Sequence, residues 1–377
     1  MKRYCLMLTM ALLLLLSACQ QAPSDQLGSS TLPPGSVENT GDGASRIKLD
    51  IPAMSSYSTG AQLTLRVDAQ VHYSGYDSAP TYVCLPMHFD NSAAAAQAFF
   101  GDGYASVQRT EDRDTAGLNW PYQTELPWIE YYKSPSGEYL NFTHGLGDII
   151  GGRSSGVDLQ SIPNIENWQQ PGDAYGDGRA SGMRLSREEC QAQAQALVDA
   201  LGLDMLLVRT DVLDLTEFQN YRFYFAHNYG GIPSSIGVNE SMRQYSWGQS
   251  LGEYLIIYVC DNGIYDVEGM LYEVVETGES QPLISAEEAV ARLMDTAAVM
   301  PLPIEPMLAS EYTIDSISLV YLPQPVEGDG VDVIGDGRNG GLKRNMIPAW
   351  QFATGYFSGT WSAIELYIDA RTGEYLQ

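Results

Sequence analysis

The C-terminal half of the chain contains the same succession of elements twice, and this repeat restricts the available folds more than any other feature. One copy opens on Ser186-Arg187-Glu188-Glu189 and the other on Ser285-Ala286-Glu287-Glu288. In each copy the third residue after the serine is glutamate, which is the pattern of a capping box at the start of a helix. The spacing of the apolar residues that follow predicts two amphipathic helices.

Three predicted strands follow each helix in the same order. They cover 205–213, 221–229 and 254–260 in the first copy, and 312–322, 348–357 and 363–369 in the second. We therefore expect each copy to be one helix packed on a three-stranded antiparallel sheet. A unit of that size would be marginally stable alone, so we expect the two copies to pack together.

Residues 46–180 are expected to form a β-rich domain ahead of the repeat. Apolar and polar residues alternate over 63–71, which is the period of a half-buried strand. The alanine-rich run 92–100 predicts a short helix that Gly101 ends. The predicted fold class is thus α+β, with an N-terminal β-rich domain followed by tandem helix-plus-three-strand antiparallel units over 181–280 and 281–377.

The second copy resembles a known family. Its segments 347–352 (I-P-A-W-Q-F) and 369–374 (D-A-R-T-G-E) are similar to the PepSY-like unit of extracytoplasmic proteins. They are most similar to the version in YycH/YycI-type regulators, which act on a sensor kinase outside the membrane. The whole chain also resembles an uncharacterised group of Gram-positive lipoproteins, known as a domain of unknown function. The resemblance implies a structural unit without catalytic residues.

The N-terminus carries the features of an export signal. Lys2 and Arg3 precede an apolar stretch over 6–16, and the sequence Leu-Ser-Ala-Cys then ends at Cys19. That ending resembles the bacterial lipobox, which implies cleavage before Cys19 and acylation of its thiol, including palmitate. Residues 20–45 are rich in Ser, Gly and Pro and predict a disordered tether. We therefore expect an extracytoplasmic lipoprotein whose lipid on Cys19 anchors it to the cell membrane.

Charge and cysteine content narrow the class of protein further. The net charge is -27, so the chain lacks the basic surface that nucleic-acid binding requires. After removal of the signal and acylation of Cys19, three cysteines remain, at 84, 190 and 260. Their wide spacing and odd number do not form a disulfide framework, and we expect buried free thiols, although one bridge stays open.

No motif of the chain predicts catalysis or metal binding. Gly248–Gly252 matches G-x-S-x-G, but a predicted strand follows it, where a hydrolase has a helix. The acidic, glycine-rich segment 327–337 lacks the ligand spacing of a calcium loop. None of the four histidines has a partner at zinc-ligand spacing, and His227 is interpreted as a satisfied sheet residue. We therefore predict neither catalytic residues, nor a metal, nor a cofactor.

Aromatic residues supply the predicted contact surface. They gather at Trp120, Tyr122, Trp128, Tyr131 and Tyr132, and aromatics are enriched at protein interfaces. The leading hypothesis is a non-enzymatic, membrane-anchored lipoprotein that binds or regulates another extracytoplasmic protein. A ligand- or cell-wall-binding lipoprotein is the alternative, and a hydrolase that uses Ser250 comes third.

Overall fold

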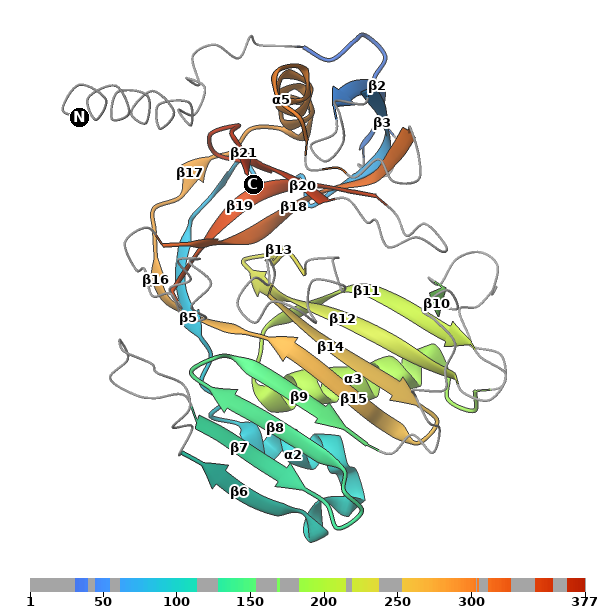
Figure 1. Cartoon of the computed structure of the whole chain (residues 1–377), viewed down its shortest axis with the longest axis vertical. Helices are drawn as coiled ribbons and strands as arrows, with labels where there is room; N and C mark the ends of the chain where they lie inside the picture. The colour runs from blue at the N-terminus through green and yellow to red at the C-terminus, as the bar shows by residue number, and fades with distance from the viewer. Residues whose placement is uncertain are drawn as a thin grey trace, which may run out of the picture.

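Two large β-sheets dominate the protein (Figure 1). The computed structural model describes residues 31–39, 45–54, 62–113, 128–153, 168–169, 183–214, 219–236, 253–302, 304, 311–326, 343–354 and 365–376. Within these residues, one sheet has nine strands, the other has ten, and a small sheet has two. None of the described helices is long and apolar enough to cross a membrane.

The nine-stranded sheet combines strands from both ends of the chain. Its order is β1 (Val37–Asn39), β2 (Ser45–Met54), β3 (Gln62–His72), β18 (Glu311–Pro325), β19 (Arg344–Thr354), β20 (Glu365–Asp369) and β21 (Tyr375–Leu376). β5 (Tyr82–Pro86) pairs with β19 on one side and with β16 (Tyr272–Thr277) on the other. The pair of β3 and β18 is parallel, and the other pairs are antiparallel. Helix α5 (Ala286–Val299) contacts β2 and β20 and supplies apolar residues to the core beneath this sheet. The sheet and α5 are called here the nine-stranded lobe, and the ten-stranded sheet with its helices is called the ten-stranded lobe.

The ten-stranded sheet takes its strands from the middle of the chain. Its order is β10 (Trp168–Gln169), β11 (Met205–Asp214), β12 (Gln219–Tyr229), β14 (Tyr254–Cys260), β15 (Gly263–Met270), β9 (Asp148–Gly152), β8 (Tyr139–His144), β7 (Trp128–Lys133) and β6 (Gln108–Asp112). β13 (Ile232–Pro233) pairs with β12. Helices α2 (Ser92–Phe100) and α3 (Arg187–Leu201) pack on one face, and the 3₁₀ turn η3 (Gly101–Ser106) follows α2. β4 (Ser78–Ala79) and β17 (Gln281–Pro282) form the two-stranded sheet.

The predicted fold class is wrong. The described residues are 56% strand and 19% helix, and their three helices do not alternate with three-stranded units. The N-terminal strands do not form a sheet of their own: β2 and β3 extend the sheet of β18, and β6–β9 extend the sheet of β15. A three-stranded unit would leave open strand edges, and the N-terminal strands cover those edges. Periodicity in the sequence is local and does not say which strands pair.

Several individual elements are confirmed. β3 and α2 lie where the alternation and the alanine run place them. At the start of α3, the Glu189 amide donates to Ser186 Oγ at 3.2 Å and the Ser186 amide donates to Glu189 Oε2 at 2.7 Å, which completes the capping box. At α5, Ser285 Oγ accepts from the Glu288 amide at 3.2 Å.

The chain crosses between the two lobes at one junction. The Met87 amide donates to the Leu271 carbonyl at 3.0 Å, and the Leu271 amide donates to the Gly147 carbonyl at 2.8 Å. A Cβ on Gly147 would lie 1.9 Å from the Leu271 carbonyl oxygen, and Gly147 has a φ of +69°, so a glycine is required there. Nearby, Ser234 forms a bridge with Tyr321 of β18. The junction therefore joins the sheets through backbone hydrogen bonds as well as through the chain itself.

Candidate functional site

The face of the ten-stranded sheet opposite α2 and α3 is the candidate site. Within the described residues no helix lies on it, and it is called here the helix-free face. Figure 1 views the sheet from this side. Directly opposed residues of antiparallel strands share a face, so the register defines its rows. One row runs Asp211, Arg222, Tyr258, Asp266, Gly152, Tyr139, Lys133. The next row runs Arg209, Tyr224, Ile256, Glu268, Ile150, Asn141, Tyr131.

The inner part of the helix-free face is a network of arginine and tyrosine. Arg222 Nη1 donates to the Tyr224 hydroxyl at 2.8 Å, and its guanidinium carbon lies 4.7 Å from the Tyr258 ring centre. Such an arrangement combines a hydrogen bond with cation–π attraction. The Tyr258 hydroxyl donates in turn to Glu268 Oε1 at 2.8 Å. Through Tyr258, the network therefore connects Arg222 to the Glu268 carboxylate of β15.

Carboxyl groups gather where the network ends. Burial, together with the charge of Glu268, raises the pKa of Asp266 to about 7. Burial also raises the pKa of Asp148, and again Glu268 adds to the shift. A carboxyl whose pKa is raised is one whose surroundings disfavour its charged form. Burial and the neighbouring Glu268 therefore favour the neutral forms of Asp266 and Asp148.

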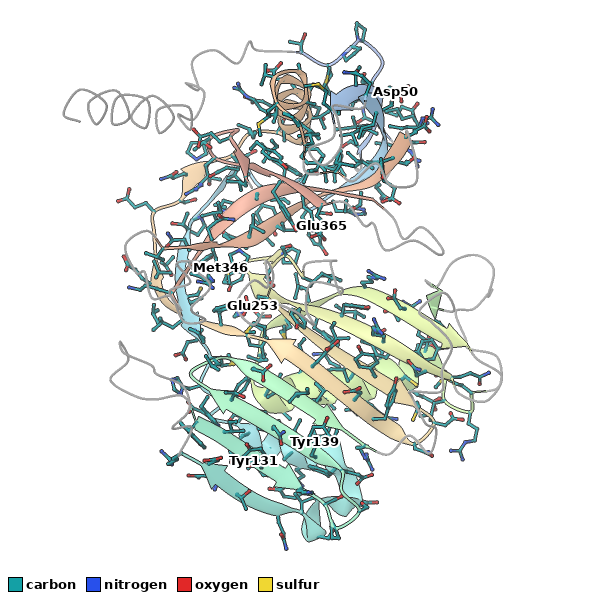
Figure 2. All side chains as sticks on the ribbon, in the orientation of Figure 1. Asp50, Tyr131, Tyr139, Glu253, Met346 and Glu365 are labelled. Atoms are coloured by element: carbon teal, nitrogen blue, oxygen red, sulfur yellow. The ribbon has the colours of Figure 1, made fainter. Side chains whose placement is uncertain are left out.

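The outer part of the face exposes apolar side chains. Tyr139 is 38% exposed and Ile150 is 43% exposed. A Cβ on Gly152 would lie 3.1 Å from Cε1 of Tyr139, so the tyrosine ring lies against the glycine backbone. Figure 2 shows Tyr139 and Tyr131 on the neighbouring strands β8 and β7 (Figure 2). Exposed apolar groups with polar neighbours are the usual composition of a binding surface.

The predicted contact residues are divided between two faces. Tyr131 lies half-buried on the helix-free face, whereas Tyr132 is 1% exposed and belongs to the core beneath α2, so it is not part of a contact surface. Neighbouring residues of a strand point to opposite faces, so Tyr131 and Tyr132 cannot share one. Trp128 shares the face of Tyr132 and stacks on His144 with ring centres 3.8 Å apart. Trp120 and Tyr122 lie outside the described residues.

A buried carboxylate ties these core residues together. Glu130 is 1% exposed and accepts hydrogen bonds from the Tyr132 hydroxyl at 2.8 Å, from His144 Nε2 at 3.1 Å and from Arg109 Nε. His144 Nδ1 accepts from the Phe89 amide, so the proton of the neutral ring sits on Nε2. Burial raises the pKa of Glu130, but its hydrogen bonds outweigh that effect and the net shift is downward. The cluster fixes β7 and β8 against α2.

A second buried carboxylate, Glu253, lies at the junction between the lobes (Figure 2). It is 0% exposed and accepts from the Tyr229 hydroxyl at 2.7 Å, from His227 Nδ1 at 3.0 Å and from the Tyr272 amide at 2.8 Å. Burial lowers the pKa of His227, but the charge and the hydrogen bond of Glu253, together with the charge of Asp204, outweigh it and the net shift is upward. The interpretation of His227 as a satisfied sheet residue is confirmed.

Neither buried carboxylate was predicted from the sequence. Glu130 lies within β7 and Glu253 directly precedes β14, and neither has a motif around it. The available signal was a charged residue at a position where the strand pattern requires an inward side chain. Cys84 lies close to the junction cluster, with Sγ 3.7 Å from the Tyr229 hydroxyl. Cys84, Cys190 and Cys260 are buried free thiols, as expected.

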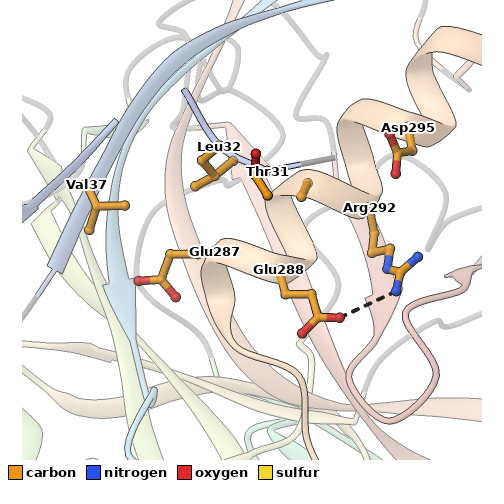
Figure 3. A pocket seen from close by; sticks show the side chains of 8 residues that line it. Thr31, Leu32, Val37, Glu287, Glu288, Arg292 and Asp295 are labelled. Carbon is orange, nitrogen blue, oxygen red and sulfur yellow. Dashed lines mark hydrogen bonds and ion pairs between the residues drawn. The ribbon is translucent and has the colours of Figure 1, made fainter. Parts of the chain in front are cut away.

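A surface depression lies beside α5 (Figure 3). Its volume is about 410 Å³, and it is lined by Thr31, Leu32, Val37, Glu287, Glu288, Ala291, Arg292 and Asp295. Arg292 Nη2 lies 3.4 Å from Glu288 Oε1, one helical turn away. Five of the eight lining residues belong to α5, and three of those five are acidic. In the part of the chain that the structure describes, no three His, Cys, Asp or Glu residues come together as metal ligands.

Three of the sequence motifs cannot be placed. Cys19, the G-x-S-x-G segment with Ser250, and the acidic segment 327–337 all lie outside the described residues. The lipidation of Cys19 stays a prediction.

Comparison with known proteins identifies the fold alone. No family model matches the chain, and no curated protein matches it, so the resemblance to PepSY-like units stays a prediction without support. Among solved structures, an uncharacterized protein from Eubacterium rectale ATCC 33656 is similar, with a TM-score of 0.54 and 15% sequence identity. The match covers 83% of this chain and 90% of that one. The two-lobed arrangement therefore recurs in a crystal structure of a distant sequence.

Proposed function

We propose that the protein is a non-enzymatic lipoprotein that binds, and thereby regulates, another protein of the cell envelope. The observation that carries this proposal is the helix-free face, where Tyr139 and Ile150 expose apolar surface beside buried carboxylates. Aromatic and apolar groups at the centre of a patch contribute most of the binding energy at protein interfaces. The broad, slightly twisted surface of a sheet suits a protein partner better than a small molecule, which prefers a concave pocket.

In this proposal the two buried carboxylate clusters, around Glu253 and Glu130, have a structural role. Glu253 and Glu130 are 0% and 1% exposed, and each accepts three or more hydrogen bonds from the protein itself. A general base needs access to a substrate proton and a free acceptor. These carboxylates instead hold strands and helices in place, which leaves the surface to carry the function.

In this proposal the predicted lipid on Cys19 determines the cellular location of the protein. Val37–Asn39, within the predicted tether over 20–45, form β1 and pair with β2. The chain ahead of β1 would therefore connect an acylated Cys19 to the folded lobes and hold them near the membrane surface, where envelope proteins are concentrated. Tethering raises the effective concentration of a partner in the same membrane, so that a modest affinity suffices. The resemblance to YycH/YycI-type regulators is consistent with this kind of action, although no match to a family model accompanies it.

Cross-linking in membranes tests the proposal. Membranes of cells that produce the protein are treated with an amine- and carboxyl-reactive cross-linker, and the protein is captured with its adducts. We expect one envelope protein to be recovered with the wild type and lost with the double variant Tyr139→Ser/Ile150→Ser. Tyr73→Ser, on an equally exposed tyrosine of the other lobe, serves as the matched control. Recovery of no specific partner, or equal loss with Tyr73→Ser, would refute the proposal.

A cell-wall polymer is the second candidate ligand. Tyr131 and Tyr139 lie on one face of neighbouring strands, and aromatic rings can stack on sugar rings. Trp128 is less suited to this role because His144 covers one side of its ring and the Arg113 guanidinium lies 4.3 Å from its centre. Binding of isolated wall polymer that Tyr139→Ala abolishes and Trp128→Ala spares would favour this alternative.

A further inference from the structure

We propose that the edge of β16 (Tyr272–Thr277) takes up an extended segment of another protein as an additional strand, one in which lysine or arginine alternates with apolar residues. This inference goes beyond the proposed function, because β16 belongs to the nine-stranded sheet and the helix-free face belongs to the ten-stranded one. Among the described strands, β16 pairs with β5 alone, so its other side is an edge (Figure 1). The N–H and C=O groups along such an edge can pair with a strand of another chain.

The hydrogen bonds at the start of β16 show which of its backbone groups point outward. Tyr272 lies opposite Pro86, which has no N–H. The Tyr272 amide donates instead to the Glu253 carboxylate at 2.8 Å, so it points away from β5. Hydrogen-bonded and non-bonded pairs alternate along an antiparallel ladder, so the Val274 amide and carbonyl point away from β5 as well. Val274 therefore offers a backbone donor and a backbone acceptor to an incoming strand.

The same stretch of β16 exposes apolar side chains. Val274 is 41% exposed and Val275 is 50% exposed. The register between β16 and β5 shifts between Val274 and Glu276, and Val275 is the extra residue of this bulge. An edge strand that exposes apolar side chains favours pairing with another chain, which would bury them.

Two carboxylates accompany the valines. Glu273 lies opposite Leu85 and Glu276 lies opposite Val83, so both glutamates lie on one face of the sheet and Val274 lies on the other. Within the part of the chain that the structure describes, neither carboxylate forms a hydrogen bond or an ion pair. Arg344 of β19 lies on the face of Val274 and not on that of the glutamates.

This arrangement specifies the occupant of the edge. A strand added along β16 places one set of its side chains beside Val274 and the alternate set beside the two glutamates. Opposite charges across a ladder stabilise it and like charges destabilise it, so the second set should be cationic. A second copy of this chain fits poorly, because antiparallel pairing about the valines would set Glu273 opposite Glu276.

Three short peptides test the inference on the whole chain, purified in a non-ionic detergent. All alternate valine with a second residue, which is lysine in the first, glutamine in the second and glutamate in the third. Fluorescence anisotropy measures their dissociation constants. We expect the lysine peptide to bind about tenfold more tightly than the glutamine peptide, and the glutamate peptide not to bind. Equal binding of the lysine and glutamine peptides would overturn the inference.

Two substitutions of Val274 separate strand addition from other modes of binding. Val274→Ala and Val274→Pro both remove the valine side chain, but only proline also removes the outward N–H. Proline is tolerated on an edge strand where the N–H faces outward, so the ladder with β5 is kept. We expect Val274→Pro to weaken binding of the lysine peptide about tenfold and Val274→Ala about twofold. Equal losses would mean that the backbone of β16 does not pair with the peptide.

A matched pair of double variants separates a local site from diffuse attraction by a chain of net charge -27. Glu273→Gln/Glu276→Gln removes two charges from β16, and Asp102→Asn/Glu188→Gln removes two from the helices of the ten-stranded lobe. We expect the first to weaken binding of the lysine peptide about tenfold and the second by less than about twofold. Losses of the same size would show diffuse attraction, and the inference would fall.

Measurements on the unaltered protein guard against misfolded variants. Hydrogen exchange of the Val274 amide should slow when the lysine peptide binds, and an unchanged rate would contradict strand addition. Sedimentation velocity should show a monomer, whereas a dimer that Val274→Pro dissociates would assign the edge to a second copy. The variant Tyr139→Ser/Ile150→Ser should bind the peptide as tightly as the wild type. Loss of binding in that variant would place the peptide on the helix-free face and overturn the inference, while the proposed function would stand.

Discussion

Glu253 shows what a single side chain does at the junction, because three groups from two strands donate to its buried carboxylate. Glu253→Ala would leave the His227 imidazole, the Tyr229 hydroxyl and the Tyr272 amide without their acceptor. Breaking a buried charged cluster by removing one member costs about 3–5 kcal/mol. We expect a loss of that size in the free energy of unfolding, measured by urea denaturation.

Tyr229→Phe is the control for this variant, since it removes one donor and leaves the carboxylate in place. Its expected cost is about 1 kcal/mol, the contribution of a single hydrogen bond. Equal costs for the two variants would mean that Glu253 does not organise the cluster.

Asp266 makes the stability of the fold depend on pH. Its pKa is about 7 in the folded protein, against an ordinary value of 3.8, so the folded state binds this proton more tightly than the unfolded state. The group therefore stabilises the fold least at high pH, and its contribution falls as the pH rises from about 4 through 7. Asp266→Asn removes this dependence. We expect the stability advantage of the variant over the wild type to grow by about 2 kcal/mol between pH 5 and pH 8.

Urea denaturation of both proteins at the two pH values checks this prediction. An advantage that stays constant, or shrinks with rising pH, would show that the Asp266 carboxyl is not held in its neutral form. A carboxyl that destabilises the fold agrees with a role in binding, because functional sites are often retained at the expense of stability.

At the level of elements, the helix start at Ser186 is stabilised by two reciprocal hydrogen bonds, whereas Ser285 contributes one side-chain acceptor. Ser186→Ala should lower the stability of the protein by about 1 kcal/mol, as the loss of a capping serine usually does. Ser285→Ala serves as the comparison and should cost no more. Thermal unfolding followed by circular dichroism measures both, and a larger loss for Ser285→Ala would contradict the assignment of the box.

The elements also show how far the sequence could be interpreted. The alternation over 63–71, the alanine run over 92–100 and the serine caps are local patterns, and the structure has β3, α2, α3 and α5 there. The partner of each strand depends on contacts far apart in the chain. The parallel pairing of β3 with β18 joins residues 64–72 to residues 311–318, and no local pattern indicates it.

The candidate site was predicted less well than the elements. Tyr131 was found because aromatic residues cluster in the sequence, but Tyr132 and Trp128 proved to belong to the opposite face. Applying the period of a strand to 128–133 would have separated them. Ile150, Asp148 and Glu268 carry no signal of their own, because their meaning comes from the register that aligns β9 with β15.

At the scale of the whole molecule, two sheets meet at a junction where Gly147, Leu271 and Glu253 join the lobes. The same arrangement occurs in an uncharacterized protein from Eubacterium rectale ATCC 33656 at 15% identity, so the fold tolerates wide change in sequence. The nine-stranded lobe continues from the predicted tether, and the ten-stranded lobe presents the helix-free face (Figure 1). In the proposed function, the predicted anchor precedes the nine-stranded lobe, and the helix-free face of the other lobe captures the partner.

The most direct test of this account is site-specific photocross-linking in living cells. A photoreactive phenylalanine analogue replaces Tyr139 on the helix-free face or, as the control, Tyr73 on the other lobe; both tyrosines are 38% exposed. The account predicts that position 139 gives one discrete adduct with an envelope protein, and that position 73 gives none. Adducts of equal yield at both positions, or an adduct at position 73 alone, would contradict the claim that the helix-free face captures the partner.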